Sequence, residues 1–274
     1  MDRMIDQWKK QQEQKLWEQA RTQTTAASTA APLTAILAAV DVLQDAADDC
    51  TPEERRDCLE VIRSNSMKLY RFIRNVEDAA FGQLDAGNPE VVHPEPLLQE
   101  ISRQVQPRLR RVGCTLAQRF DETPHLISID RQILLRILGN LIANAVNASE
   151  VGDTVTLFLE NQPDGVRIGV EDCGCGMSAQ MLDLILNAQD TARSTGLRGC
   201  RMLLDAMGTK LCAQSAVGKG SRFWFELPAC DSSAVLGFNV WNLQIECADG
   251  LPVLDVELSV LAPRQKNEEA DAEL

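Results

Sequence analysis

The stretch NLIANAVNAS, residues 140–149, sets three asparagines along one side of an otherwise apolar helical pattern. Asn140, Asn144 and Asn147 are spaced by four and three residues, so their amides share one helical face. The opposite face is apolar and is expected to pack into a core. Amides are costly to bury without hydrogen-bond partners. This stripe therefore indicates either a solvated face or a ligand-binding surface.

Two glycine-containing segments follow this helix. In DCGCGM, residues 172–177, Gly174 and Gly176 allow a tight turn and close backbone approach to a ligand. Asp172 ends an apolar strand pattern, where a carboxylate needs a donor such as the exocyclic amine of adenine. In STGLRGCRMLLDAMG, residues 194–208, small residues lead into a helix N-terminus, which suits phosphate binding. Each segment alone is also compatible with an ordinary turn or loop-to-helix junction.

Outside these segments, hydrophobic periodicity divides the chain into a helical part and a mixed α/β part. Residues 3–47 and 52–81 predict two long helices, and the composition of residues 82–96 predicts a linker. Two antiparallel helices bury little surface alone, so we expect dimerisation into a four-helix bundle. In the second part we expect helices at 97–112, 131–149, 179–186 and 197–207, and strands at 114–120, 126–129, 154–160, 165–172, 210–215 and 222–227.

The predicted fold class is α+β, with an N-terminal helical hairpin ahead of an α/β domain. After Pro228, an apolar stretch surrounds a turn at residues 248–250 and predicts a β-hairpin. The predicted boundaries are a helical hairpin at 1–82, a linker at 83–96, the α/β domain at 97–228, a β-hairpin extension at 229–263 and a disordered tail at 264–274.

Composition narrows the class of protein and its partners. The net charge of −13 disfavours nucleic acid and anionic membrane surfaces as partners. The longest nearly apolar run, residues 30–40, is too short to span a bilayer, and the polar N-terminus has no signal-peptide pattern. Nine scattered cysteines without a CxxC pair indicate reduced thiols rather than disulfides or zinc ligands. We therefore expect a soluble, cytoplasmic protein without membrane insertion.

Taken in order, the three polar and glycine-containing segments resemble the N box, first glycine box and second glycine box of sensor histidine kinases. The segment GKGSRFWFELP, residues 218–228, resembles the last strand pair of their ATP-binding domain. The resemblance covers residues 93–228, and the preceding hairpin matches the family's dimerisation domain in position and layout. It implies a two-layer α/β sandwich that binds ATP and Mg²⁺.

The resemblance also implies roles for individual residues. Asn144 would ligate Mg²⁺, Asn140 would lie near the phosphates, and Asp172 would bind the adenine amine. The other residues implied to form the nucleotide site come from the same boxes and the last strand: Asn147, Gly174, Gly176, Met177, Gly196, Leu197 and Ser221.

The chain departs from the family pattern at two places. The segment between Met177 and Gly196 is short and holds no phenylalanine, which indicates a degenerate nucleotide lid. The segment PLTAI, residues 32–36, resembles the end of the family's histidine box, and in that register the phosphoacceptor falls at Ala27 and the acidic base at Ser28. A methyl group cannot accept a phosphoryl group, so no catalytic residue is predicted there.

Asn140 also separates this chain from the hydrolytic relatives of the fold, which have a glutamate at that position. An amide cannot take a proton from an attacking water or hydroxyl group. We therefore expect a dimeric, histidine-kinase-like pseudokinase that binds ATP and acts with a partner, such as a response regulator or another kinase. Two alternatives remain open: an active kinase that phosphorylates a partner in trans, and a non-catalytic interaction module with a vestigial ATP pocket.

Overall fold

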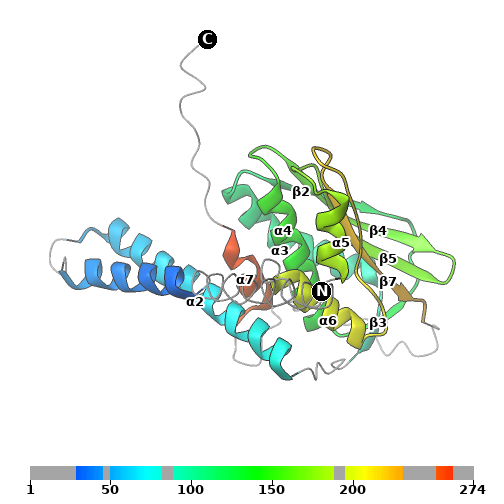
Figure 1. Cartoon of the computed structure of the whole chain (residues 1–274), viewed down its shortest axis with the longest axis horizontal. Helices are drawn as coiled ribbons and strands as arrows, with labels where there is room; N and C mark the ends of the chain where they lie inside the picture. The colour runs from blue at the N-terminus through cyan, green and yellow to red at the C-terminus, as the bar shows by residue number, and fades with distance from the viewer. Residues whose placement is uncertain (1–28, 46–49, 82–88, 188–194, 231–250, 262–274) are drawn as a thin grey trace, which may run out of the picture. The chain divides into compact units, whose positions relative to one another are not determined.

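A computed structural model describes residues 29–45, 50–81, 89–187, 195–230 and 251–261 (Figure 1). The chain divides into two compact units, the first built mainly on residues 1–80 and the second on residues 81–188 and 196–274. Within the described ranges, no helix combines the length and apolar character needed to cross a bilayer.

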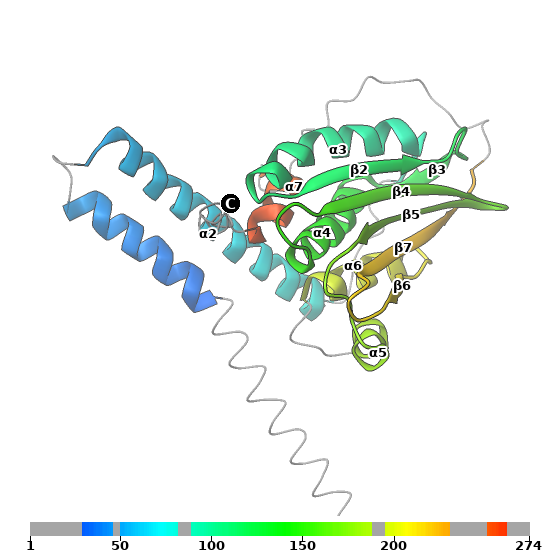
Figure 2. The same ribbon diagram turned by 90° about the horizontal axis from the view of Figure 1, so that it is seen from above.

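The first unit is a helical hairpin. Residues 29–45 form one helix, and α2 (Pro52–Phe81) runs back alongside it (Figures 1 and 2). Thr51 caps α2: its Oγ1 accepts from the Glu54 backbone N at 3.2 Å, while the Glu54 carboxylate accepts from the Thr51 N at 2.9 Å. This reciprocal capping box explains why the helix starts where the sequence predicts.

The second unit is built on a five-stranded sheet of order β2-β4-β5-β7-β6. Only the β2–β4 pair is parallel; the other pairs are antiparallel. The strands are β2 (Thr115–Phe120), β4 (Thr154–Gln162), β5 (Gly165–Asp172), β6 (Cys212–Ser215) and β7 (Ser221–Pro228). A separate two-stranded sheet pairs β1 (Glu90–Val92) with β3 (Ile127–Ile129).

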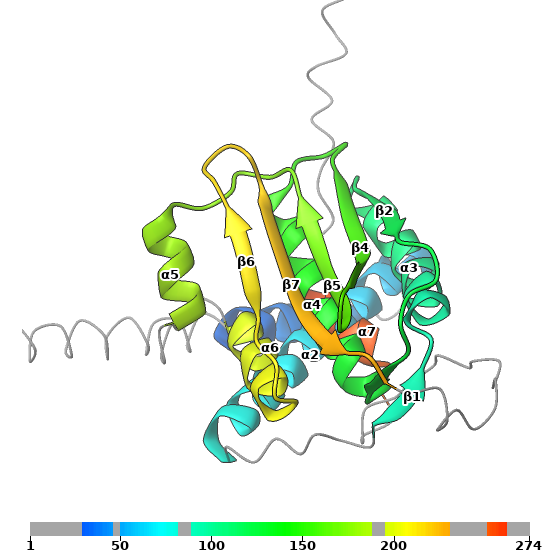
Figure 3. The same cartoon turned by 90° about the vertical axis from the view of Figure 1, so that its right-hand side faces the viewer.

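Helices cover one face of the five-stranded sheet, as Figure 3 shows. They are α3 (Pro94–Arg111), α4 (Arg131–Ala148) and α6 (Thr195–Ala206), while α5 (Ala179–Asn187) lies beside β6. The α4 helix starts at Asp130, whose side chain accepts from the Ile133 N at 3.1 Å. Because most α4 residues are buried, this helix is the centre of the core. The predicted α+β class and two-layer sandwich are confirmed.

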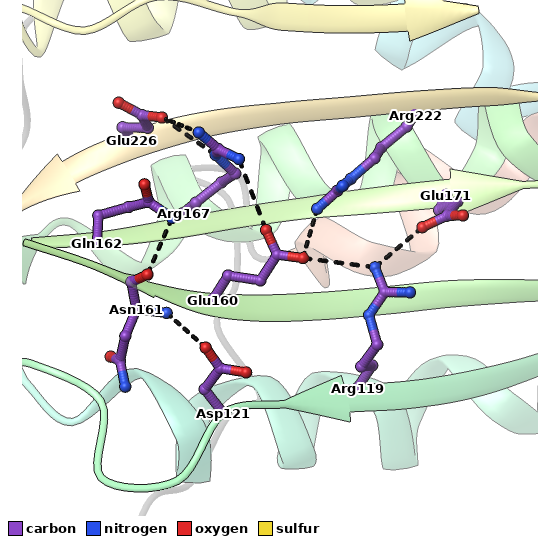
Figure 4. Close-up of polar contacts among 9 residues, drawn as sticks. All are labelled: Arg119, Asp121, Glu160, Asn161, Gln162, Arg167, Glu171, Arg222 and Glu226. Carbon is purple, nitrogen blue, oxygen red and sulfur yellow. Dashed lines mark hydrogen bonds and ion pairs between the residues drawn. The ribbon is translucent and has the colours of Figure 1, made fainter.

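The opposite face of the sheet carries a network of ion pairs (Figure 4). Glu160 contacts Arg222 at 2.5 Å and Arg119 at 3.6 Å. Phe158 lies beneath these two arginines, whose guanidinium carbons are 4.1 Å and 5.4 Å from its ring centroid, and its side chain is fully buried. The arginines therefore cover an aromatic ring while pairing with carboxylates, a combination that keeps this face polar.

Part of the predicted linker at 83–96 is ordered structure. Glu90–Val92 forms β1, and α3 begins at Pro94 rather than at residue 97. Val92 is only 3% exposed, so a single apolar side chain anchors this short strand in the core. Pro94 suits the first helical position because its missing N–H would have no helical partner there.

The predicted β-hairpin at 229–263 is wrong where the structure describes it. Val253–Glu257 forms the helix α7, and Leu258–Val260 forms a 3-10 turn, η2. The apolar residues of this segment are spaced by three and four, which suits a helix packing on α4 better than a strand. Residues 231–250 and the predicted disordered tail at 264–274 lie outside the described residues.

Candidate functional site

Asp172, the last residue of β5, links this strand to the turn at residues 173–177 and to the start of β7. Its side chain is only 5% exposed, and its Oδ1 accepts from the Gly174 N at 2.9 Å and from the Ser221 N at 3.2 Å. These bonds join the turn after β5 to the start of β7. Among the described residues, no hydrogen bond ends on Oδ2, so this oxygen is available to a donor on a ligand.

Burial raises the pKa of Asp172, while the two backbone hydrogen bonds lower it less than burial raises it. The charges of Asp153 and Glu171 raise the pKa further. A neutral donor reaching Oδ2 would favour the ionised form. The site therefore suits an exocyclic amine better than an anionic group.

The glycines of the turn are required by close packing against protein backbone. A Cβ on Gly174 would overlap the carbonyl oxygen of Ala148 at the end of α4, and Cys175 N donates to that same oxygen at 3.2 Å. Gly176 has a φ of +62°, and a Cβ there would overlap the Ala216 carbonyl oxygen. We expected these glycines to allow approach to a ligand; the approach observed is to α4 and to the turn between β6 and β7.

Ser215 is a site residue that sequence reasoning missed. Its Oγ accepts from the Met177 N at 2.8 Å, lies 2.9 Å from the Ser221 Oγ and donates to the Gly220 O at 3.0 Å. Ser215 pairs with Ser221 across the β6–β7 hairpin. Only this register, which no motif reveals, could have indicated that Ser215 positions Met177.

The three asparagines lie along α4 with graded exposure. Asn140 is 4% exposed, Asn144 is half-buried and Asn147 is exposed. Asn140 Nδ2 donates to the Arg136 O at 2.9 Å and to the Glu257 Oε2 at 2.6 Å. Asn144 Nδ2 is buried and has no hydrogen-bond partner among the described residues. A buried amide without a partner is the kind of group that a ligand completes.

The second glycine box lies only partly within the described residues. Gly196 and Leu197 lie in the first turn of α6, and Leu197 is 6% exposed, so its side chain belongs to the core. Cys200 Sγ lies 3.8 Å from the Ile137 O and packs α6 against α4. Ser194, the first residue of this segment, lies outside the described residues, as do Ala27 and Ser28.

A magnesium ion would fit this site only together with phosphate oxygens. Among the described residues, no group of three His, Cys, Asp or Glu side chains could hold a metal ion. Mg²⁺ typically takes one or two protein oxygens and completes its shell with water and substrate phosphates. Asn144 has its Nδ2 buried, which leaves its Oδ1 as the atom able to face a cation.

The fold and the arrangement of α4, the turn after β5 and the start of α6 define an ATPase domain of the histidine-kinase type. Residues 129–231 match the family described as "Histidine kinase-, DNA gyrase B-, and HSP90-like ATPase". This part of the chain therefore belongs to that ATPase family, and the chain is related to the sensor histidine kinases of two-component systems.

One relative among the sensor kinases illustrates the similarity. The adaptive-response sensory kinase SasA of Synechococcus elongatus is 28% identical over 214 residues, 72% of this chain and 55% of that protein. The chain thus spans about half the length of that kinase.

Two solved structures share the fold. ShkA in complex with AMPPNP has a TM-score of 0.55 at 23% identity, covering 81% of this chain and 47% of ShkA. ThkA in complex with the response regulator TrrA has a TM-score of 0.56 at 19% identity, covering 83% and 66%.

Alanine substitution should destabilise the protein more at Gly176, in the turn after β5, than at Gly218, in the turn between β6 and β7. Gly218 has a φ of +73° with no atom within 4 Å of a built Cβ, so Gly218→Ala should cost about 1 kcal/mol of unfolding free energy from backbone strain alone. Gly176→Ala adds an overlap with the Ala216 carbonyl oxygen and should cost about 3 kcal/mol or more. Urea unfolding of both variants measures the difference; equal costs would show that the turn does not pack as described.

The raised pKa of Asp172 predicts a pH-dependent change in stability. Folding favours the protonated form, so the stabilising effect is complete below the ordinary carboxyl pKa and is lost as pH rises through the raised pKa. Asp172→Asn can keep both bonds to Oδ1 and has no proton to lose. Its unfolding free energy relative to wild type should therefore increase as pH rises above about 4, the ordinary carboxyl pKa, which urea unfolding at a series of pH values measures.

Proposed function

We propose that the second unit binds Mg-ATP and that the chain acts in two-component signalling through a partner protein. The observation that carries the nucleotide assignment is the buried Asp172 carboxylate, which commits Oδ1 to the backbone and leaves Oδ2 to a ligand. The adenine amine would donate to Oδ2. In the relative ShkA, the same fold was solved in complex with AMPPNP, which supports a nucleotide as the ligand.

The remaining residues would act on the two ends of the nucleotide. The α4 helix runs from Ala148, beside the adenine end, back to Asn140, a separation of about 12 Å at 1.5 Å per residue. Asn144 Oδ1 would hold Mg²⁺, and Asn140 would donate to a phosphate. When bound, Mg²⁺ supplies positive charge to the phosphate oxygens. The buried Nδ2 of Asn144, which has no partner among the described residues, favours a ligand at this face of α4 over a vestigial pocket.

Asp172→Asn tests the nucleotide site directly. An asparagine that keeps Oδ1 on the Gly174 and Ser221 amides turns its NH₂ group toward the adenine amine, so two donors would face each other. Calorimetry should show ATP binding weakened by about 1–3 kcal/mol, with and without Mg²⁺. Asp164→Asn, exposed and at the opposite end of β5, should bind as wild type. Equal ATP affinity in wild type and Asp172→Asn would mean that the pocket does not hold adenine.

The partner is proposed to be a response regulator or another kinase. ThkA, which shares the fold, was solved with a response regulator. The hairpin exposes large apolar side chains, including Leu33, Leu37, Leu59 and Ile73, each at least half exposed. One copy leaves these side chains in water, so a homodimer that packs two hairpins into a four-helix bundle would cover them.

Autophosphorylation tests the proposed loss of the acceptor. In the histidine-box register, Ala27 and Ser28 replace the acceptor imidazole and its base, so the chain should not label itself with radioactive ATP as an acid-labile phosphohistidine. The double change Ala27→His, Ser28→Glu restores both groups and should produce labelling. Ala27→His alone, without the carboxylate, should label more weakly.

One outcome would contradict this register, and a second would change the proposed function. Labelling of the unmodified chain at His93 or His125 would show that it has an acceptor of its own. Labelling of a purified partner by a chain that does not label itself would instead identify an active kinase that works in trans.

A further inference from the structure

The helix α7 places a carboxylate on the first asparagine of α4. Glu257 is fully buried, and its Oε2 lies 2.6 Å from the Asn140 Nδ2. The approach is close because residue 139 is glycine: a Cβ there would lie 2.7 Å from the Glu257 Cβ. The segment lies beyond residues 129–231, the part of the chain that matches the ATPase family.

Several contacts hold α7 on the helical layer. Val253 and Leu254 of α7, and Leu258 of η2 directly after it, are buried members of the main core. Asp255 forms an ion pair with Arg108 of α3, so α7 contacts both α3 and α4. These contacts hold the Glu257 side chain in place, because α7 packs its apolar side chains against α4 and forms an ion pair with α3.

The donors of Asn140 are fully used in this arrangement. A side-chain amide has two N–H groups, and those of Asn140 point to the Arg136 carbonyl oxygen and to Glu257. A phosphate oxygen at Asn140 would need the second of these donors. The Glu257 oxygen and a phosphate oxygen would both be acceptors for this one N–H group, so the amide can serve only one of them at a time.

From this geometry we infer that α7 is an autoinhibitory segment whose Glu257 carboxylate competes with the nucleotide's phosphates for Asn140. The inference rests on the proposed nucleotide site. ATP binds with its phosphates on Asn140 only when α7 leaves α4, and α7 returns when the phosphates leave. Because such coupling is reciprocal, anything that releases α7 tightens ATP binding, and ATP binding releases α7.

Two substitutions test the competition in different ways. Glu257→Ala removes the carboxylate and frees one N–H of Asn140, while Gly139→Ala pushes α7 away through a contact of the new methyl group with Glu257. Calorimetry should give a Kd for ATP about tenfold lower in both variants, or about 1.4 kcal/mol tighter. The Kd for adenosine, which has no phosphate, should stay within twofold. Glu95→Ala, which removes an exposed carboxylate of α3, is the matched control and should leave both constants unchanged.

The adenosine measurement separates failure of this inference from failure of the proposed function. Adenosine binding that depends on Asp172, together with ATP affinity that is equal or weaker in both variants, overturns the competition but leaves the nucleotide site intact. Weaker ATP binding in Glu257→Ala would make Glu257 part of the ATP site instead of its competitor. Absence of adenosine and ATP binding in every variant overturns both proposals.

Hydrogen exchange gives a second measurement on the unmodified chain. Saturating ATP should raise amide exchange in residues 253–258 severalfold, whereas adenosine should leave it unchanged. Protection of these amides by ATP, or no change, would contradict the release of α7.

Discussion

The structure of the second unit depends on the two hydrogen bonds that end on one oxygen of Asp172. They tie the end of β5 to the turn that follows it and to the first residue of β7. Glycine is needed at the neighbouring positions 174, 176 and 220, because a Cβ at each would overlap a carbonyl oxygen of the adjoining backbone. Burial of Asp172 also raises the pKa of its carboxyl group, because the ionised form is poorly solvated there. A ligand that donates a hydrogen bond to the second oxygen would stabilise the ionised form.

The α4 helix connects the Asp172 region to Asn140, at the other end of the candidate site. Its C-terminal carbonyl at Ala148 receives the Cys175 amide, and its middle receives α7 through Gly139 and Asn140. The same helix that centres the core therefore carries polar groups on its one remaining face. Exposure rises along that face from Asn140 to Asn147, and the half-buried Asn144 between them has an amide nitrogen without a partner in the described structure.

Local patterns were sufficient to predict the strands of the main sheet, the helices α4 and α6, and the turn at Pro163 and Asp164 between β4 and β5. They failed for β1 and α7, because these short elements depend on burial against distant parts of the chain. β1 has three residues and one buried valine, which is too little for a periodic signal. In α7 the turn-forming residues before it suggested a hairpin, although its apolar spacing suits a helix.

The same limit applies to the site. The asparagine stripe and the glycine turns are local motifs, so their residues could be named from the sequence. Ser215 and Glu257 could not, since each acts through a partner set by tertiary structure; Glu257 lies 117 positions from Asn140.

That distant contact changes what Asn140 can do chemically. In this chain the residue on α4 is an amide, which can only donate or accept a hydrogen bond, and the nearby carboxylate arrives from α7. Because Glu257 is fully buried against the amide, it is kept from water as well as from the phosphates. The side chain that gives α7 its polar contact with α4 therefore also decides whether Asn140 has an N–H group left for a ligand.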